Sequence, residues 1–291
     1  MSQFRAFAAE ERILIRGQQK HYSELSSLEH WVPVVMSKEP EGIWWRYMLE
    51  QRFIDPFFSN TIHHLKPHQR FSCFTPIEVI EKLPNNLAPT AFIFHISRCG
   101  STLLTQLLAS VQQCIVMSEP SILDSFFRQS NLDNVESVKI LQGLIYALGQ
   151  KRFHFEEKFF IKLDSWHLPY LPLLRKAFPQ TPCLFLYRNP EEVLNSHRRQ
   201  RGPQMIPGWM DAEWLQLNTN GLEPSDFDGY CATVLESFFK SALDATLSND
   251  LILLNYQQLP SIVFSHLLEL FSIGCTQEEL DAMKERSQFH A

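Results

Sequence analysis

Side chains that bind anions or move protons follow four short apolar runs between residues 91 and 190. Arginine, lysine and hydroxyl side chains suit phosphate, whereas carboxylates and imidazoles can accept a proton in a transfer reaction. The residues at or just after the four runs are Arg98, Cys99, Gly100, Ser101 and Thr102, then Glu119, then Lys162, Asp164 and His167, and finally Arg188. The sequence predicts that they meet in one anion-binding site with a base beside it.

The segment Ser97–Thr102 is predicted to be a strand-to-helix turn with a glycine, hydroxyl side chains and a cation. Such a turn points backbone N–H groups and a helix N-terminus at an anion, although an ordinary loop with a helix-capping hydroxyl has a similar composition. It is not a nucleoside-triphosphate loop of the GxxxxGK[ST] type, because Ser101 stands where the lysine would be. A cysteine-phosphatase loop would need arginine at Thr105, so Cys99 is expected to be a loop residue rather than a nucleophile.

A second candidate anion site lies between Arg188 and Ser196, which are separated by eight positions. If a helix begins near Pro190, Ser196 lies about two turns along it and can face the same sheet edge as Arg188. The same residues also fit a purely structural strand, proline turn and helix. Together with the first turn, they suggest a ligand that carries two phosphates.

These residues are positioned by alternating strand and helix patterns, which are typical of a parallel sheet in an α/β fold. Open α/β sheets bind ligands at the carboxyl ends of their strands, where the polar residues stand. The predicted strands are Ala91–Ile96, Cys114–Met117, Phe159–Leu163, Cys183–Tyr187 and Leu251–Leu254. Helices are expected over Thr102–Val111, over Leu168–Phe178, from about Pro190, and as two closing helices, the last with a capping box of Thr276 and Glu279.

The chain changes in composition near residues 82–90, which are rich in proline and asparagine. Before this stretch it is aromatic-rich without a regular pattern. We therefore expect an N-terminal accessory region at 1–85 and an α/β domain at 86–291. Four tryptophans either line an apolar pocket or are core or interface residues: Trp44, Trp45, Trp166 and Trp209.

Composition excludes several classes of protein. The formal net charge of −6 over 291 residues argues against a general nucleic-acid binder. No apolar run approaches the roughly 18 residues of a membrane helix. Glu10 and Glu11 interrupt the place of a signal peptide's apolar stretch, which predicts a cytoplasmic protein. The six cysteines lie far apart and without a CxxC pair, so reduced thiols are expected rather than a zinc site or a disulfide framework.

Four segments carry a family resemblance. IFHISRCGSTLLTQLL resembles the 5′-phosphosulfate-binding loop of sulfotransferases that use 3′-phosphoadenosine 5′-phosphosulfate (PAPS), and YRNPEEVLNS resembles their 3′-phosphate motif. LILLNYQQL and FSIGCTQEEL are similar to segments that follow the last strand in that family. The resemblance spans about residues 90–290. It implies a three-layer α/β/α fold like that of P-loop NTPases, and in-line sulfuryl transfer without a metal.

Residue by residue, the resemblance implies that Cys99–Thr102 contact the 5′-phosphate and that Arg98 neutralises charge as the sulfuryl group leaves. Arg188 and Ser196 would hold the 3′-phosphate, and Lys162 is a second cation. Cys99 stands where serine is usual, and glutamines at 257 and 258 replace an acidic pair.

Three residues compete as the base. Glu119 resembles the catalytic glutamate of tyrosylprotein sulfotransferases, and Asp164 resembles the position of the histidine in cytosolic sulfotransferases. His167 has the most suitable unperturbed pKa, but it also suits a helix cap. The acceptor would be a hydroxyl or amine of a small molecule or peptide, with no nucleic acid or membrane partner; the oligomeric state stays open. The alternatives are a nucleotide or nucleoside kinase-like enzyme and a non-catalytic nucleotide-binding relative.

Overall fold

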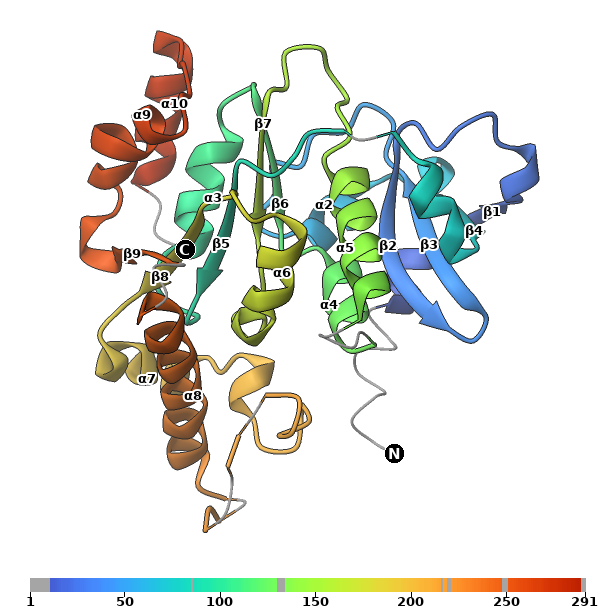
Figure 1. The fold of residues 1–291 in the computed structure, drawn as a ribbon. Helices are drawn as coiled ribbons and strands as arrows, with labels where there is room; N and C mark the ends of the chain where they lie inside the picture. The colour runs from blue at the N-terminus through green and yellow to red at the C-terminus, as the bar shows by residue number, and fades with distance from the viewer. Residues whose placement is uncertain are drawn as a thin grey trace.

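A five-stranded sheet in the order β6-β7-β5-β8-β9 lies at the centre of the protein, and every neighbouring pair is parallel (Figure 1). The computed structural model describes residues 11–84, 86–129, 134–215, 217–218, 221–223, 225–247 and 251–288. The strands are β5 (Ala91–His95), β6 (Cys114–Ser118), β7 (Lys158–Lys162), β8 (Cys183–Tyr187) and β9 (Ile252–Asn255). All five predicted strands are confirmed, with ends shifted by no more than one residue.

Helices cover both faces of this sheet. On one side lie α3 (Ser101–Ala109), α9 (Leu268–Leu270) and α10 (Gln277–Ser287); on the other lie α4 (Ser121–Phe127), α5 (Val135–Leu148) and α6 (Leu171–Ala177) (Figure 1). Two further helices, α7 (Pro190–Arg199) and α8 (Phe227–Leu247), pack against each other. The predicted three-layer α/β/α class is confirmed.

The helix starts follow local chemistry. The Asn189 side chain accepts the N–H of Glu191 and Pro190 opens α7, so this helix begins at the predicted residue. Thr276 and Glu279 form the predicted capping box of α10. A 3₁₀ turn at Leu168–Tyr170 leads directly into α6, which confirms the predicted helical stretch.

The N-terminal region forms a second sheet, in the order β1-β4-β3-β2. Its strands are β1 (Gln18–Lys20), β2 (Trp31–Lys38), β3 (Glu41–Tyr47) and β4 (Phe71–Thr75), and α2 (Phe58–His64) lies between the last two. The first five residues of β2 are buried in succession, so this strand lacks the alternation by which sequence reveals half-buried strands. The sheet packs through β2 against α4 and α5, and Trp45 is fully buried in it.

None of the helices within the described ranges is both long and apolar enough to cross a membrane. All six cysteines are free thiols, and five of them are buried.

Candidate active site

A cavity of about 590 Å³ lies at the carboxyl edge of the five-stranded sheet. Each strand leads into a residue that lines it. His95 ends β5, Glu119 follows β6, Lys162 ends β7, Arg188 follows β8 and Tyr256 follows β9. Because parallel strands end on the same side, residues that are far apart in sequence converge on one ligand site.

All but one of the predicted site residues line this cavity. They are Arg98, Cys99, Gly100, Ser101, Thr102, Glu119, Lys162, Asp164, Arg188 and Ser196. The exception is His167, whose side chain is buried outside the cavity lining. The structure therefore brings together both predicted anion sites and two of the three candidate bases.

The cavity is cationic although the chain is acidic. Among the described residues, four cationic side chains and two carboxylates line it, while the whole chain carries a formal net charge of −6. Concentrating cations in a concave site focuses the electrostatic potential there and favours anionic ligands. The cations are Arg98, Lys162, Arg188 and Arg286, and the carboxylates belong to Glu119 and Asp164.

The turn between β5 and α3 has an unusual backbone. Ser97, Arg98 and Gly100 adopt left-handed conformations, with φ of 70°, 49° and 81°. A Cβ atom on Gly100 would come within 2.8–3.1 Å of Leu259 and Tyr256, so the turn also needs glycine for space.

The backbone of Glu119 also has a left-handed conformation, with φ of 56°. Of the six non-glycine residues with left-handed φ in the described chain, Ser97, Arg98 and Glu119 line this one cavity. Such conformations cost on the order of 1–3 kcal/mol each and cluster at functional sites. The residues with left-handed backbone conformations therefore lie at the same edge of the sheet as the charged side chains of the cavity.

Lys162 and Glu119, which both line the cavity, form an ion pair. Lys162 Nζ lies 2.7 Å from Glu119 Oε1 and 3.4 Å from the hydroxyl oxygen of Thr102. The ammonium group also lies 5.0 Å from the ring centre of Phe57, at the start of α2. Lys162 therefore connects the carboxylate to the anion-binding turn.

The pKa of Glu119 reflects this pairing. Burial by itself raises the pKa of the carboxyl, but the charge of Lys162 and the nearby His95 outweigh it and lower the pKa to about 2. Glu119 is thus ionised at neutral pH and is available as an acceptor for a proton.

His95 is a residue of the site that sequence reasoning missed. Its Nε2 lies 3.3 Å from Glu119 Oε1, and its Nδ1 accepts the backbone N–H of Ser97 over 3.0 Å. The sequence does carry a signal, because His95 is the only polar side chain in the buried run AFIFHI, but a single histidine in a strand also fits a purely structural role.

The second predicted anion site is built around Arg188. Its Nε donates to Glu192 over 2.6 Å, and its guanidinium carbon lies 4.3 Å from the ring centre of Tyr256. Its Nη1 also reaches the carbonyl oxygen of Arg98 at 3.5 Å. The two cationic sites are therefore adjacent, and Ser196 of α7 lines the same cavity.

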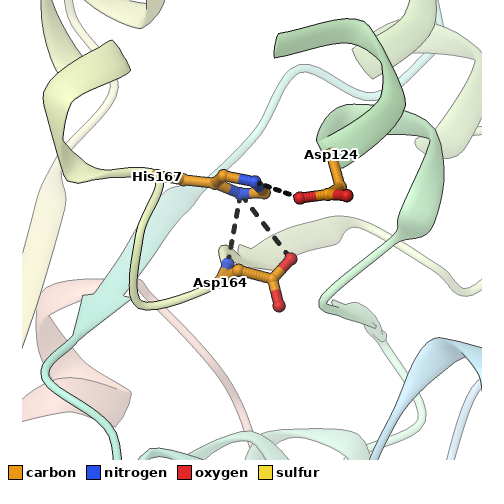
Figure 2. Close-up of side chains that lie close together, drawn as sticks. All are labelled: Asp124, Asp164 and His167. Atoms are coloured by element: carbon orange, nitrogen blue, oxygen red, sulfur yellow. Dashed lines mark hydrogen bonds and ion pairs between the residues drawn. The ribbon is translucent and has the colours of Figure 1, made fainter. Parts of the chain in front are cut away.

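His167 belongs to a buried cluster with Asp124 and Asp164, of which Asp164 also lines the cavity (Figure 2). His167 Nε2 lies 3.0 Å from Asp124 Oδ1, and its Nδ1 accepts the backbone N–H of Asp164 over 3.3 Å. Trp166 donates its indole N–H to the same Asp124 oxygen over 2.8 Å, and Arg128 pairs with the other oxygen. The side chain of His167 makes no helix-cap hydrogen bond.

Burial, with a contribution from Arg128, lowers the pKa of His167 to about 3. The ring is therefore neutral at neutral pH. Ligand atoms of Asp124, Asp164 and His167 lie within 4.8 Å of one another, a spacing that suits a metal ion. However, a cation there would have to displace Arg128 and the indole N–H of Trp166, so this donor set fits a hydrogen-bonded network better.

Cys99 lines the cavity but is poorly suited to nucleophilic chemistry. Burial raises the pKa of its thiol to about 11, and the side chain is fully buried. The thiolate is the reactive form, so Cys99 is a packing residue of the turn, in agreement with the sequence prediction.

Two further residues enter the cavity from distant parts of the chain. Phe57 comes from the N-terminal region and Arg286 from α10, where it donates to the side chain of Gln106 over 2.9 Å. No sequence signal distinguishes them, since an arginine in an amphipathic helix is usually a solvated residue. Of the four tryptophans, Trp166 lines this cavity, Trp44 and Trp209 line another, and Trp45 belongs to the core.

No protein-family model matches the chain, and no curated protein sequence matches it. Among solved structures, sulfotransferase STF9 from Mycobacterium avium shares 15% identity over 72% of this chain and 69% of that chain, with a TM-score of 0.43. The sulfotransferase domain from the curacin biosynthetic pathway shares 18% identity over 67% of this chain and 77% of that chain, with a TM-score of 0.44. A sulfotransferase from Alicyclobacillus acidocaldarius shares 13% identity over 69% of this chain and 92% of that chain, with a TM-score of 0.39. These likenesses are distant, and the functional argument rests on the cavity itself.

Proposed function

We propose that this protein is a sulfotransferase that transfers a sulfuryl group from PAPS to a hydroxyl or amine of a small molecule or peptide. The observation that carries the proposal is the cationic cavity into which all five strands lead, with the Lys162–Glu119 pair beside the anion-binding turn. Such a cavity combines charge for a nucleotide with a carboxylate for an acceptor proton.

The residues present fit a nucleotide with phosphates at two positions. The turn from Arg98 to Thr102 and the first turn of α3 offer N–H groups and hydroxyls to the 5′-phosphate. Arg188 and Ser196 suit the 3′-phosphate, and Arg188 is held in place by Tyr256 and Glu192. When bound, PAPS would supply an activated sulfuryl group and a phosphate leaving group.

We assign proton acceptance to Glu119. In the reaction, the acceptor oxygen or nitrogen forms a bond to sulfur, the bond between sulfur and the phosphate oxygen breaks, and the acceptor's proton passes to the carboxylate. Asp164 also lines the cavity and is the alternative base. His167 is left out of proton transfer, because both of its ring nitrogens face partners in the buried cluster.

Lys162 has two possible partners in this scheme. With Lys162 at 2.7 Å, Glu119 has a low pKa and is a weak base. When Lys162 turns to an anion beside Thr102, its charge moves away from the carboxylate, and the pKa of Glu119 rises. The same movement places positive charge where the leaving phosphate needs it, so one lysine serves both halves of the reaction.

The test of the donor is calorimetric titration with 3′-phosphoadenosine 5′-phosphate (PAP), beside AMP and ATP–Mg²⁺. We expect micromolar binding of PAP and much weaker binding of the other two. In Arg188→Ala, PAP affinity should fall by about 30-fold, because a charge-assisted hydrogen bond contributes roughly 2 kcal/mol, whereas AMP affinity should change little. Equal losses for both nucleotides would refute the 3′-phosphate assignment, and preference for ATP–Mg²⁺ would favour a kinase-like enzyme.

The test of the reaction is release of PAP from PAPS, first with water and then with a panel of phenols, alcohols and amines. Acceptor-dependent release with a sulfated product detected by mass spectrometry is the expected result. Tight PAP binding without release under any of these conditions would instead identify a non-catalytic nucleotide-binding protein.

A further inference from the structure

His95 has a defined tautomer. It ends β5, is 6% exposed, and its Nδ1 accepts the N–H of Ser97. Burial, followed by the charge of Lys162, lowers its pKa, so the ring is neutral at neutral pH. A neutral imidazole whose Nδ1 accepts a hydrogen bond carries its proton on Nε2. The proton therefore lies on the nitrogen that faces Glu119.

The two oxygens of Glu119 have different surroundings. Lys162 Nζ and His95 Nε2 both approach Oε1, at 2.7 and 3.3 Å. Within the described residues, no hydrogen bond or ion pair reaches Oε2. Among the described residues, Nε2 of His95 forms no hydrogen bond of standard geometry. The acceptor that it faces is Oε1 of Glu119. Its N–H is thus placed to close on Oε1 once Lys162 withdraws.

We propose that His95 is a positioning residue for sulfuryl transfer: its Nε2–H holds Oε1 of Glu119 while Lys162 serves the donor, so that Oε2 receives the acceptor's proton. The inference rests on the proposed function and assigns a task to each carboxylate oxygen. The proton moves from the acceptor to Oε2, and His95 keeps its own proton throughout. Without His95, the carboxylate would lose both partners on Oε1 when Lys162 moves.

His95 does not act as the base itself. Nδ1 is occupied by the N–H of Ser97, and Nε2 carries a proton, so the ring has no lone pair for an acceptor. The charged groups that face it are Glu119, after β6, and Lys162, on β7, and the backbone of Leu163 is its other polar neighbour. These surroundings favour a neutral hydrogen-bond donor.

The test measures the pKa of Glu119 by ¹³C NMR in the complex with PAP, with its signal assigned by its loss in Glu119→Gln. Two variants distinguish loss of the hydrogen-bond donor from loss of the imidazole ring. His95→Leu removes the N–H, and His95→Gln keeps an N–H at a similar distance from the backbone. We expect His95→Leu to raise the pKa of Glu119 by about one unit, since a hydrogen bond to a carboxylate favours the charged form. His95→Gln should raise it by less than half as much.

His197 provides a matched control, because it is also buried and its Nδ1 also accepts a backbone N–H, from Gly202 at 3.3 Å. His197→Leu should leave the pKa of Glu119 unchanged. In the active enzyme, His95→Leu should move the acidic limb of the pH–rate profile upward by the same unit and lower kcat about tenfold or more, with PAP affinity within about twofold.

The outcomes separate the two hypotheses. An unchanged Glu119 pKa and pH–rate profile in His95→Leu would overturn the role of His95 while transfer from PAPS continues. A raised pKa in a protein that transfers no sulfuryl group would overturn the proposed function and with it the catalytic meaning of the contact. If His95→Leu does not fold, ¹⁵N NMR of the wild-type ring decides: a proton on Nδ1 would overturn the proposal, and a proton on Nε2 would support it.

Discussion

Two clusters of the same residue types lie next to each other in this protein and differ in what surrounds them. In the cavity, Glu119 faces Lys162 and His95. In the buried cluster, Asp124 faces His167 (Figure 2). Asp124 also pairs with Arg128 and accepts the indole N–H of Trp166. Each has a carboxylate, a histidine and a cation, but of the two carboxylates Glu119 lines the cavity at the sheet edge and Asp124 does not.

The difference lies in how many partners each carboxylate has. Asp124 receives the indole N–H of Trp166, the ring of His167 and the guanidinium of Arg128, so its oxygens are occupied. Glu119 has both partners on Oε1 and is 21% exposed. A carboxylate that lines a cavity and has a spare oxygen can exchange protons, whereas one whose oxygens are both occupied holds structure together.

The largest effect that separates the clusters is expected from Glu119→Gln. A positioned base contributes about 10²–10⁴-fold to rate, so turnover of PAPS should fall about 1000-fold. The amide oxygen can still accept from Lys162, and PAP affinity should stay within about threefold. Rates and calorimetry on the same preparation check both expectations, and a variant with wild-type turnover would exclude Glu119 as the base.

The next effect is on stability and concerns Asp124→Asn. Breaking a buried, hydrogen-bonded ion pair costs about 3–5 kcal/mol, because the opposite charge stays behind. We expect the free energy of unfolding, measured with urea, to fall by about 3 kcal/mol. Glu119→Gln should cost roughly 2 kcal/mol or less, because Lys162 lines the cavity and keeps the Thr102 hydroxyl as a partner. The comparison between the clusters would fail if Glu119→Gln were the less stable of the two.

A smaller effect is the dependence of stability on pH. The pKa of His167 is 6.5 in the unfolded chain and about 3 when folded, because burial disfavours the charged ring. As pH falls below 6.5, the unfolded chain binds a proton that the folded ring refuses, so stability present above 6.5 is progressively lost. Between about pH 7.5 and about pH 5.5, His167 should contribute about 1.4 kcal/mol of this loss.

His167→Gln should remove that contribution, which urea unfolding at both pH values would measure. Glu119→Gln is the control, because a carboxyl whose pKa is lowered from 4.5 to about 2 loses its stabilising effect only as pH falls through that range. An identical pH slope in wild type and His167→Gln would show that the ring is not held neutral.

The sequence was sufficient to predict the five-stranded sheet and the residues at its carboxyl edge. It was not sufficient to predict which side chains pair with each other in the two clusters. Because parallel strands end on one side, polar residues after each apolar run could be placed together from order alone, and Glu119 and Lys162 do line one cavity. Arg128 lies only four positions from Asp124, a spacing that also suits an ordinary pair on a helix surface. The other partners of Asp124 lie 42 and 43 positions away and are set by how α4 packs on the loop after β7, so the cluster could not be predicted from sequence. The N-terminal sheet was missed because its buried strands do not alternate.

The smallest expected effect, and the one that refines the comparison most, concerns Asp164, which belongs to both clusters. Its side chain lines the cavity, and its Oδ2 lies 3.7 Å from His167 Nδ1. The hydrogen bond that it gives to His167 comes from its backbone N–H, so Asp164→Asn leaves that contact in place.

If Glu119 is the base, Asp164→Asn should lower turnover by less than about tenfold and leave PAP affinity unchanged, because it removes charge near the acceptor but no proton acceptor. Rates for both single variants and for the double variant with Glu119→Gln would measure this. A larger loss in Asp164→Asn than in Glu119→Gln would move the base to Asp164, and the carboxylate that pairs with Lys162 and His95 would then not be the reactive one.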